Sequence, residues 1–251
     1  METLRKFFDS LWQYFLSLFY QRELKITIVG LQNSGKTSLA RALLSKPFEQ
    51  DTIPTLGMRM EQFYIGTNLI QLFDLAGQHR FHYMWNRYFD RSDLIIYVLD
   101  LSDMTNWNEA KHKLWDVLIK VNENATPVVL LGNKTDLVAP SEASAAAKRA
   151  LKKSKSKGTA KEQPIMEDVY MAPLLRNYDY DDIPVFQLDE TNLYLLRNIE
   201  ILSKELGLDL KSNVLHTDTT QVSITSELVM FPISCKNGDN IQDILEWIAQ
   251  M

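Results

Sequence analysis

The stretch Gly30-Leu31-Gln32-Asn33-Ser34-Gly35-Lys36-Thr37 decides the fold of this chain. It matches the phosphate-loop pattern, in which two glycines are separated by four residues and followed by Lys and then Ser or Thr. The glycines let backbone N–H groups close around phosphate oxygens, Lys36 supplies a positive charge, and Thr37 offers a hydroxyl to Mg²⁺. The alternative interpretation is a structural glycine turn. The candidate nucleotide-binding residues of this segment are Gly30, Asn33, Ser34, Gly35, Lys36, Thr37 and Ser38.

The segments around this loop alternate between strand and helix. A β-branched run from Leu24 to Gly30 indicates a strand, and the pattern from Gly35 to about Ser45 is helical. Further strands are expected at 58–65, 69–75, 94–100, 127–133 and 228–233, and further helices at 106–121 and 240–249. The first two of these strands flank Gly66-Thr67-Asn68, which predicts a hairpin. The alternation predicts an α/β fold with a six-stranded, mostly parallel sheet flanked by helices.

A carboxylate closes the predicted strand 69–75, in the sequence Asp74-Leu75-Ala76-Gly77-Gln78. An acid at a strand end beside a phosphate loop has the position of a Walker-B residue, which predicts that Asp74 holds Mg²⁺, through water. Gly77 can bring its N–H close to a γ-phosphate, and Gln78 can orient an attacking water. We therefore expect Gln78 to be catalytic, together with Lys36.

Two further segments predict a guanine site. Asn133-Lys134-Thr135-Asp136 follows the strand 127–133, and Asp136 can accept hydrogen bonds from N1 and N2 of guanine, which adenine cannot donate. Ser234-Cys235-Lys236 follows the last strand, and the backbone N–H of Cys235 is expected to reach the guanine oxygen. A small buried side chain is an equally compatible interpretation of Cys235. The tetrapeptide favours GTP over ATP, which argues against an ATP-dependent kinase.

A loop at Thr52-Ile53-Pro54-Thr55-Leu56-Gly57 lies between the first helix and the second strand. Thr55 is placed to bind Mg²⁺ and to sense the γ-phosphate, which would order the loop. The predicted metal ligands are therefore Thr37, Thr55 and Asp74, and Thr55 also joins the predicted catalytic set.

Composition and charge exclude several classes of protein. The chain has 251 residues, of which 45% are hydrophobic and 24% charged, as in ordinary globular proteins. Its net charge of −5 argues against nucleic acid as a partner. Cys235 has no second cysteine to pair with, which favours a reducing compartment. The sequence has no apolar run long enough for a transmembrane helix, and the four histidines, His79, His82, His112 and His216, lack metal-ligand spacing.

The first twenty residues predict an amphipathic helix. Apolar side chains recur at spacings of three and four, and seven of the twenty residues are aromatic. Such a helix suits a membrane interface, where it would be a weak and reversible anchor; a core helix is the alternative. We expect residues 1–23 to form this anchor and its connector. The predicted membrane-contacting residues are Leu4, Phe7, Phe8, Leu11, Trp12, Phe15, Leu18 and Phe19.

Residues 139–188 interrupt the alternation of strands and helices. The first half of the segment is basic and the second half acidic, with no clear periodicity, so we expect a largely disordered insertion. Residues 142–153 are compatible with a short alanine-rich helix. The lysines between Lys148 and Lys161 could bind acidic lipid, although a solvated linker is the favoured interpretation. A helical pattern returns at about 191–206, and residues 24–251 apart from the insertion account for one nucleotide-binding domain.

These motifs together resemble the Arf family of small GTPases, within the P-loop NTPases, and in particular its lysosomal, eighth Arf-like subclass. The pattern T-x-P-T-x-G at 52–57 and the N-terminal helix distinguish the chain from Ras- and Rab-like proteins. The stretches that carry the subclass resemblance are 17–19, 31–32, 77–88, 234–236 and 239–241. Glu2 replaces the usual glycine, so myristoylation is not possible, and Phe73, Ala76 and Met58 also depart from the family pattern. Trp85 and Tyr88 suit either core packing or effector contact.

The resemblance implies a GTP/GDP switch that attaches to membranes in its GTP state and hydrolyses GTP slowly without an activating protein. It also implies an exchange factor, effector proteins that bind the switch regions, a monomeric state, and a place on the cytoplasmic face of lysosomes or late endosomes in exchange with the cytosol. In the lysosomal subclass, an acetylated initiator Met and the bare helix provide the anchor. A GTP-binding scaffold with negligible hydrolysis is the alternative function.

Overall fold

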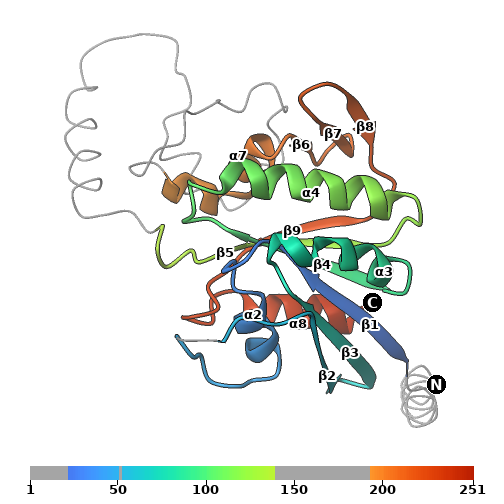
Figure 1. Ribbon diagram of the computed structural model, residues 1–251, viewed down its shortest axis with the longest axis vertical. Helices are drawn as coiled ribbons and strands as arrows, with labels where there is room; N and C mark the ends of the chain where they lie inside the picture. The colour runs from blue at the N-terminus through green and yellow to red at the C-terminus, as the bar shows by residue number, and fades with distance from the viewer. Residues whose placement is uncertain (1–21, 51–52, 139–192) are drawn as a thin grey trace, which may run out of the picture.

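A computed structural model describes residues 22–50, 53–138 and 193–251, in which a six-stranded sheet lies between two layers of helices (Figure 1). The strand order is β2-β3-β1-β4-β5-β9, and β2 alone in this sheet runs antiparallel to its neighbour. The predicted sheet and its hairpin are confirmed, although Asn68 begins β3 and does not belong to the turn. The strands are β1 (Glu23–Val29), β2 (Met58–Ile65), β3 (Asn68–Leu75), β4 (Leu94–Asp100), β5 (Val128–Asn133) and β9 (Leu228–Pro232).

Helices cover both faces of this sheet, as Figure 1 shows. One face packs against α2 (Lys36–Leu43) and α8 (Ile241–Ala249), and the other against α3 (Trp85–Phe89), α4 (Trp107–Asn122) and α7 (Ile199–Glu205). Strand β4 explains why both faces are buried, because its side chains alternate between two cores. Ile95, Tyr97 and Leu99 lie in the core under α4, whereas Leu94, Ile96 and Val98 lie in the core with α2 and α8.

The topology gathers the sequence motifs at one edge of the sheet. The carboxyl ends of the parallel strands β1, β3, β4, β5 and β9 all lie there. From β1 the chain goes first to β3, on one side of β1, and then to β4, on the other side of β1. This edge is therefore a topological switch point. Open α/β sheets bind their ligands at such points.

The predicted helical segment 191–206 is divided in two within its described part. A 3₁₀ helix, η3 (Leu193–Arg197), precedes α7, and Asn198 separates them. The Asn198 side chain accepts hydrogen bonds from the backbone N–H groups of Glu200 and Ile201, so it starts a new helix instead of continuing the old one. The prediction was right about helical structure and wrong about its continuity.

A second, three-stranded antiparallel sheet was not predicted. It consists of β6 (Leu208–Asp209), β7 (Val214–His216) and β8 (Gln221–Ser223), which lie between α7 and β9 in the sequence. In Figure 1 this sheet lies beyond α4, on the side away from the six-stranded sheet. Strands of two or three residues are too short to produce a recognisable alternation. Asn122 at the end of α4 anchors this sheet, because its side chain donates to Ser223 O and accepts from the N–H of Thr225.

Several expectations fall outside the described residues. These are the N-terminal helix up to residue 21, the insertion at 139–188 and its short helix at 142–153. Among the residues that the structure does describe, no helix combines the length and apolar character needed to cross a membrane.

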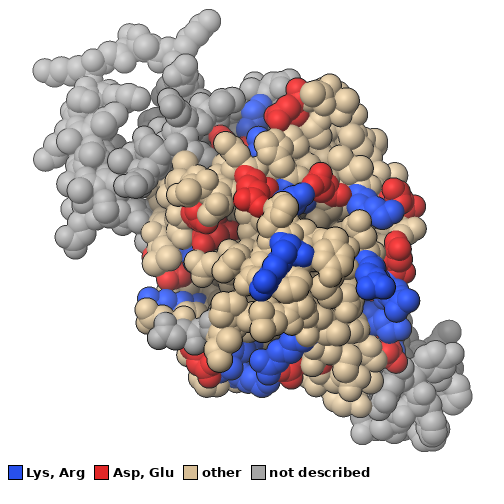
Figure 2. Space-filling view, viewed as in Figure 1, with Lys and Arg blue, Asp and Glu red and all other residues tan. Residues whose placement is uncertain are grey.

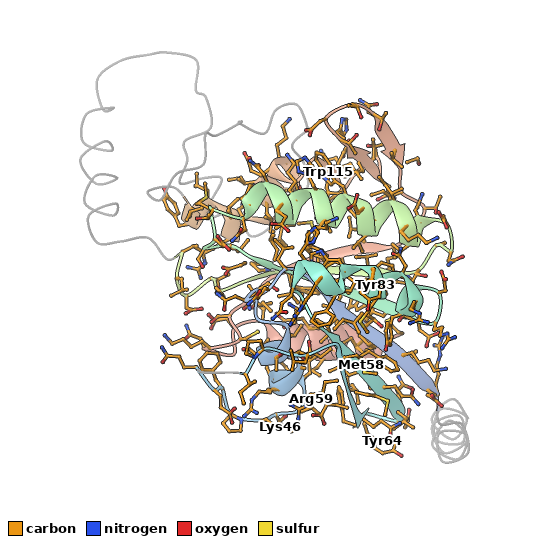
Figure 3. The ribbon with its side chains drawn as sticks, viewed as in Figure 1. Lys46, Met58, Arg59, Tyr64, Tyr83 and Trp115 are labelled. Atoms are coloured by element: carbon orange, nitrogen blue, oxygen red, sulfur yellow. The ribbon has the colours of Figure 1, made fainter. Side chains whose placement is uncertain are left out.

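Trp115 attaches the small sheet and α7 to α4, and Figure 3 labels it between these elements. Its indole Nε1–H donates to Leu206 O at 2.8 Å, and the side chain is buried. Gly207 follows with a φ of 74°, and a Cβ there would lie 2.3 Å from His216 O, so the chain can pass this point only with glycine.

We predict that Trp115→Phe lowers the free energy of unfolding by about 2 kcal/mol, because it removes the donor to a buried carbonyl and leaves a cavity. Urea unfolding followed by circular dichroism measures the change. Trp247→Phe on α8 is the matched control, since the Trp247 indole is half-buried and donates to no acceptor in the described part of the chain. Equal stability of Trp115→Phe and the native chain would contradict the anchoring role.

Candidate functional site

A cavity of about 650 Å³ opens at the carboxyl edge of the sheet and brings the predicted motifs together. Its lining includes residues 32–33 and 35–38 of the phosphate loop, and residues 53–55 and 77–78 of the two loops expected to face the γ-phosphate. It also includes residues 133–134, 136 and 235–236, from the two segments expected to bind guanine. Four predicted residues, Gly30, Ser34, Asp74 and Ser234, do not line the cavity and lie behind those that do.

Three glycines of the site stand where no side chain fits. A Cβ at Gly35, whose φ is 96°, would lie 2.1 Å from Asn133 Nδ2, and one at Gly30 would lie 2.3 Å from Val98 O. A Cβ at Gly77 would lie 2.4 Å from Lys36 Nζ. The glycine pattern of the sequence therefore has a steric cause: the loops approach one another more closely than any side chain allows.

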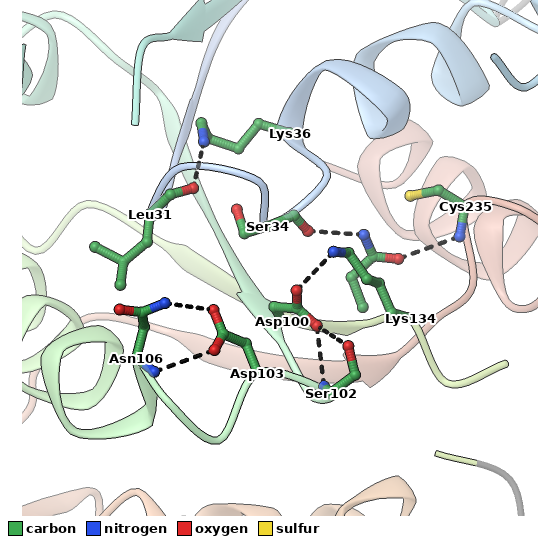
Figure 4. Close-up of polar contacts among 10 residues, drawn as sticks. Leu31, Ser34, Lys36, Asp100, Ser102, Asp103, Asn106, Lys134 and Cys235 are labelled. Carbon is green, nitrogen blue, oxygen red and sulfur yellow. Dashed lines mark hydrogen bonds and ion pairs between the residues drawn. The ribbon is translucent and has the colours of Figure 1, made fainter. Parts of the chain in front are cut away.

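Lys36 is a buried cation at the start of α2. Its Nζ donates to Leu31 O at 2.7 Å, as Figure 4 shows. Burial lowers the pKa of Lys36 to about 8, and the nearby charge of Asp74 opposes this shift. Because the ammonium is poorly solvated, an anion that entered the cavity beside it would interact strongly.

Oxygen ligands converge next to Lys36. Thr37 Oγ1 donates to Asp74 Oδ2 at 2.7 Å, and the hydroxyls of Thr37 and Thr55 are 3.0 Å apart. The second carboxylate oxygen, Asp74 Oδ1, is buried and has no hydrogen-bond partner among the described residues. Burial raises the pKa of Asp74, while the hydrogen bond from Thr37 and the charge of Lys36 oppose the shift. Both hydroxyls thus contact Oδ2 of the same carboxylate, whose other oxygen is free to bind. A carboxylate with one unpartnered oxygen beside two hydroxyls fits a hard cation such as Mg²⁺.

The two loops on either side of the β2–β3 hairpin are joined at the cavity. Ala76 N–H donates to Gly57 O at 2.8 Å, directly next to Gly77. This bond extends the ladder in which Met58 pairs with Leu75. A backbone hydrogen bond therefore joins the segment that carries Thr55 to the segment that carries Gly77 and Gln78.

Asn133 ties the base end of the cavity to the phosphate loop. Its Nδ2 donates to Ser34 O at 2.8 Å, and its Oδ1 accepts from Cys235 N–H at 3.2 Å (Figure 4). Ser234 Oγ donates to Asp136 Oδ1 at 2.7 Å, which orients the carboxylate that the sequence assigns to guanine. Lys134 Nζ lies 2.6 Å from Asp100 Oδ2, so this side chain is also held in place.

Cys235 lies in the lining of the cavity at its base end. Its backbone N–H donates to Asn133 Oδ1 in the structure, and the expected contact of this N–H with the guanine oxygen stays a prediction. Burial raises the pKa of the Cys235 thiol to about 12, so the thiol is neutral near pH 7. Cys235 therefore lines the cavity as a small, unreactive side chain.

Six lining residues were missed in the sequence because they occupy positions within or beside the motifs to which no contact was assigned. They are Gln32, Phe48, Gln50, Ile53, Pro54 and Leu137. Three of them, Phe48, Ile53 and Leu137, are large apolar side chains that are 42%, 88% and 61% exposed, and this exposure is visible only in the structure.

Trp85 and Tyr88, which the sequence assigned either to core packing or to effector contact, have different environments in the structure. Trp85 is buried and its Nε1–H donates to Ala76 O at 3.2 Å, so it belongs to the core. Tyr88 is half-buried, and its ring centroid lies 5.5 Å from that of Phe73. Nearby, Met58, Tyr64 and Tyr83 are exposed on β2 and on the 3₁₀ helix η1 (His79–Met84), as Figure 3 shows.

Comparisons with known proteins agree with this geometry. Residues 11–167 match the profile of the ADP-ribosylation factor family. ADP-ribosylation factor-like proteins 8b and 8c of Arabidopsis thaliana are each 41% identical over 128 residues, which make up 51% of this chain and 70% of theirs. The solved structure of the Arl6 BBS3 small GTPase from Trypanosoma brucei with bound nucleotide analogue GppNp has a TM-score of 0.50 and 19% identity, over 91% of this chain and 98% of that one, which supports the fold. The chain therefore belongs to the ADP-ribosylation factor family of small GTPases, which are GTP hydrolases.

Proposed function

We propose that this chain is a GTP/GDP switch that attaches reversibly to membranes in its GTP state and recruits effectors that position or move lysosomes and late endosomes. The observation that carries the switch is the contact of Thr55 with Thr37 and Asp74. This contact connects the surface loop that carries Thr55 to the proposed position of the γ-phosphate and its cation. Loss of that phosphate would therefore release the loop.

At the phosphate end, Lys36 neutralises oxygens of the β- and γ-phosphates, and the N–H groups of residues 30–38 surround them. Thr37, Thr55 and Asp74 hold Mg²⁺, with Asp74 acting through water. Mg²⁺, when bound, offsets the negative charge of the phosphates. The unpartnered Asp74 Oδ1 supports this assignment.

At the base end, Asp136 accepts hydrogen bonds from guanine, with Ser234 holding its carboxylate and Asn133, Lys134 and Lys236 completing the site. An adenine ring would not supply the donors that guanine offers to the half-buried Asp136 carboxylate, and such losses discriminate strongly between substrates.

Hydrolysis depends on Gln78, which orients the attacking water. In the described part of the chain, the cavity lining contains no arginine to stabilise the transition state. Turnover is therefore slow until an activating protein supplies the missing charge, which in related switches is worth about 10³–10⁵ in rate. An exchange factor reverses the switch, and effectors read the loops around Thr55 and Gly77.

The membrane anchor is the apolar face of residues 1–20, followed by a connector to residue 23. Basic and acidic side chains are interspersed on the face of the domain in Figure 2, so this face has no broad positive field for acidic lipid. Within the helix, the basic residues Arg5 and Lys6 are offset by Glu2 and Asp9, so adhesion is hydrophobic. One such helix is a weak anchor suited to reversible binding. The lysosomal or endosomal location rests on the resemblance to the eighth Arf-like subclass.

We predict that Gln78→Leu slows GTP hydrolysis in the presence of its activator by at least about 100-fold and leaves the GTP form bound, because the water is no longer oriented. Thr37→Asn removes a cation ligand and prevents the GTP form. Single-turnover hydrolysis of the GTP-loaded full chain measures the first effect, retention of labelled GTP by the full chain measures the second, and Gln242→Leu on α8 is the control for both. Normal turnover of Gln78→Leu would contradict the catalytic role, and absence of turnover in the native chain with its activator would favour a GTP-binding scaffold.

We predict that GTP-loaded full chain floats with liposomes and that GDP-loaded chain does so less, because the apolar face is available in one state only. Removal of residues 1–20, or the pair Phe8→Glu and Phe15→Glu, abolishes flotation, whereas Gln13→Glu on the polar face changes it little. Equal flotation after truncation would end the anchor assignment.

A further inference from the structure

Three side chains of η1 and α3 hold the three consecutive residues that follow the end of β3. Each reaches back to a different residue of the loop that carries Gln78. The contacts are Trp85 Nε1–H to Ala76 O at 3.2 Å, His82 Nε2 to Gly77 O at 2.9 Å, and Arg80 Nε–H to Gln78 Oε1 at 2.9 Å. The middle contact concerns the peptide that lies closest to the phosphate loop.

Gly77 lies against the phosphate loop. A Cβ on it would be 2.4 Å from Lys36 Nζ and 2.6 Å from Gly30 O. A small rotation of this backbone therefore changes where the Gly77 N–H points relative to the cavity. The carbonyl bond to His82 is the side-chain contact that fixes this rotation.

The hydrogen bond determines the protonation state of His82. Because a carbonyl oxygen can only accept, Nε2 must carry the proton. The other ring nitrogen, Nδ1, is buried and has no hydrogen-bond partner among the described residues. A proton on Nδ1 would create a buried charge without an acceptor, so the contact as it stands requires the neutral Nε2–H tautomer.

We propose that His82 is a positioning residue for GTP hydrolysis. In its neutral form it fixes the Gly77 peptide against the phosphate loop, and through that peptide it sets the place of Gln78. His82 touches neither nucleotide nor water in this role. The inference rests on the proposed function, in which Gly77 contacts the γ-phosphate and Gln78 orients the attacking water.

The surroundings of His82 keep it neutral. Burial lowers its pKa below the ordinary value of 6.5, the bond to Gly77 opposes this shift, and Trp85 covers the ring at a centroid distance of 4.4 Å. The charged groups that face it are Lys113 and Glu109 on α4 and His79 on η1; Lys113 and His79 disfavour the imidazolium, and Glu109 favours it. The positioning by His82 is therefore complete at pH 7 and is lost as the pH falls through the folded-state pKa, which lies below 6.5.

Three variants of the full chain separate positioning from packing. His82→Ala removes the donor, His82→Gln supplies a donor that does not titrate, and His79→Gln changes the neighbouring histidine, whose ring centroid lies 5.4 Å from that of His82. We measure single-turnover GTP hydrolysis from pH 5.5 to 8 and the dissociation rate of GDP. Hydrolysis should be about five- to tenfold slower in His82→Ala at pH 7.5, with GDP dissociation changed less than about twofold, since one hydrogen bond is lost outside the GDP contacts.

The pH profile gives the more specific result. At pH 7.5, His82→Gln should hydrolyse GTP at most of the native rate, unlike His82→Ala. Below pH 6.5, the native chain and His79→Gln should both lose more of their hydrolysis rate than His82→Gln does. Native rates in His82→Ala, no recovery in His82→Gln, or the same acid loss in the native chain and His82→Gln would each overturn the proposal.

The tautomer can be measured separately in the GDP-bound chain by imidazole ¹⁵N chemical shifts. The expected result is an Nε2–H tautomer with a pKa below 6.5, and an Nδ1–H tautomer or a pKa of 6.5 or higher would overturn the proposal. If the native chain failed to hydrolyse GTP under any condition, the proposed function would be wrong. If the native chain hydrolysed GTP and His82→Ala did so at the same rate, only the role of His82 would be wrong.

Discussion

The carboxamide of Asn133 holds the two ends of the nucleotide cavity together. Its nitrogen donates to Ser34 O in the phosphate loop, and its oxygen accepts from Cys235 N–H in the base loop. Only 2% of Asn133 is exposed, and the residue fits because Gly35 has no Cβ to displace it. Three motifs, each about a hundred residues from the next in the sequence, are thus one steric and hydrogen-bonded unit, and none can change alone.

The rest of the site is arranged around this fixed unit by the sheet. The parallel strands bring Asp74, Asp100 and Asn133 to one edge, and the hairpin of β2 and β3 connects the loop that carries Thr55 to the loop that carries Gly77. The bond from Ala76 N–H to Gly57 O also joins these two loops. A hydrogen-bonded base end and a joined pair of loops at the phosphate end suit the proposed switch, since loss of a phosphate could then release the loops and leave the base end intact.

The sequence predicted the centre of the sheet well because β4 and β5 are buried on both faces. The apolar runs at β4 and β5 and the glycine spacing of the phosphate loop admit few other folds. The contacts between loops could not be predicted from the sequence, because tertiary geometry determines which donor meets which acceptor. The N–H of Cys235 illustrates this: the motif placed it at the base, but a buried Asn133 oxygen also needed a donor. The small sheet β6-β7-β8 was missed because strands of two or three residues leave no periodic signal, and Asn198 divided a helix that looked continuous.

Displacement of bound fluorescent GDP by competing nucleotides tests the central claim most directly. The full chain, in Mg²⁺, should release the label when unlabelled GTP or GDP is added in modest excess. ATP should fail to displace it even at about a hundredfold excess, because adenine offers no donors to the Asp136 carboxylate. Equal displacement by ATP and GTP would contradict the account, since the cavity would then bind phosphates without reading guanine.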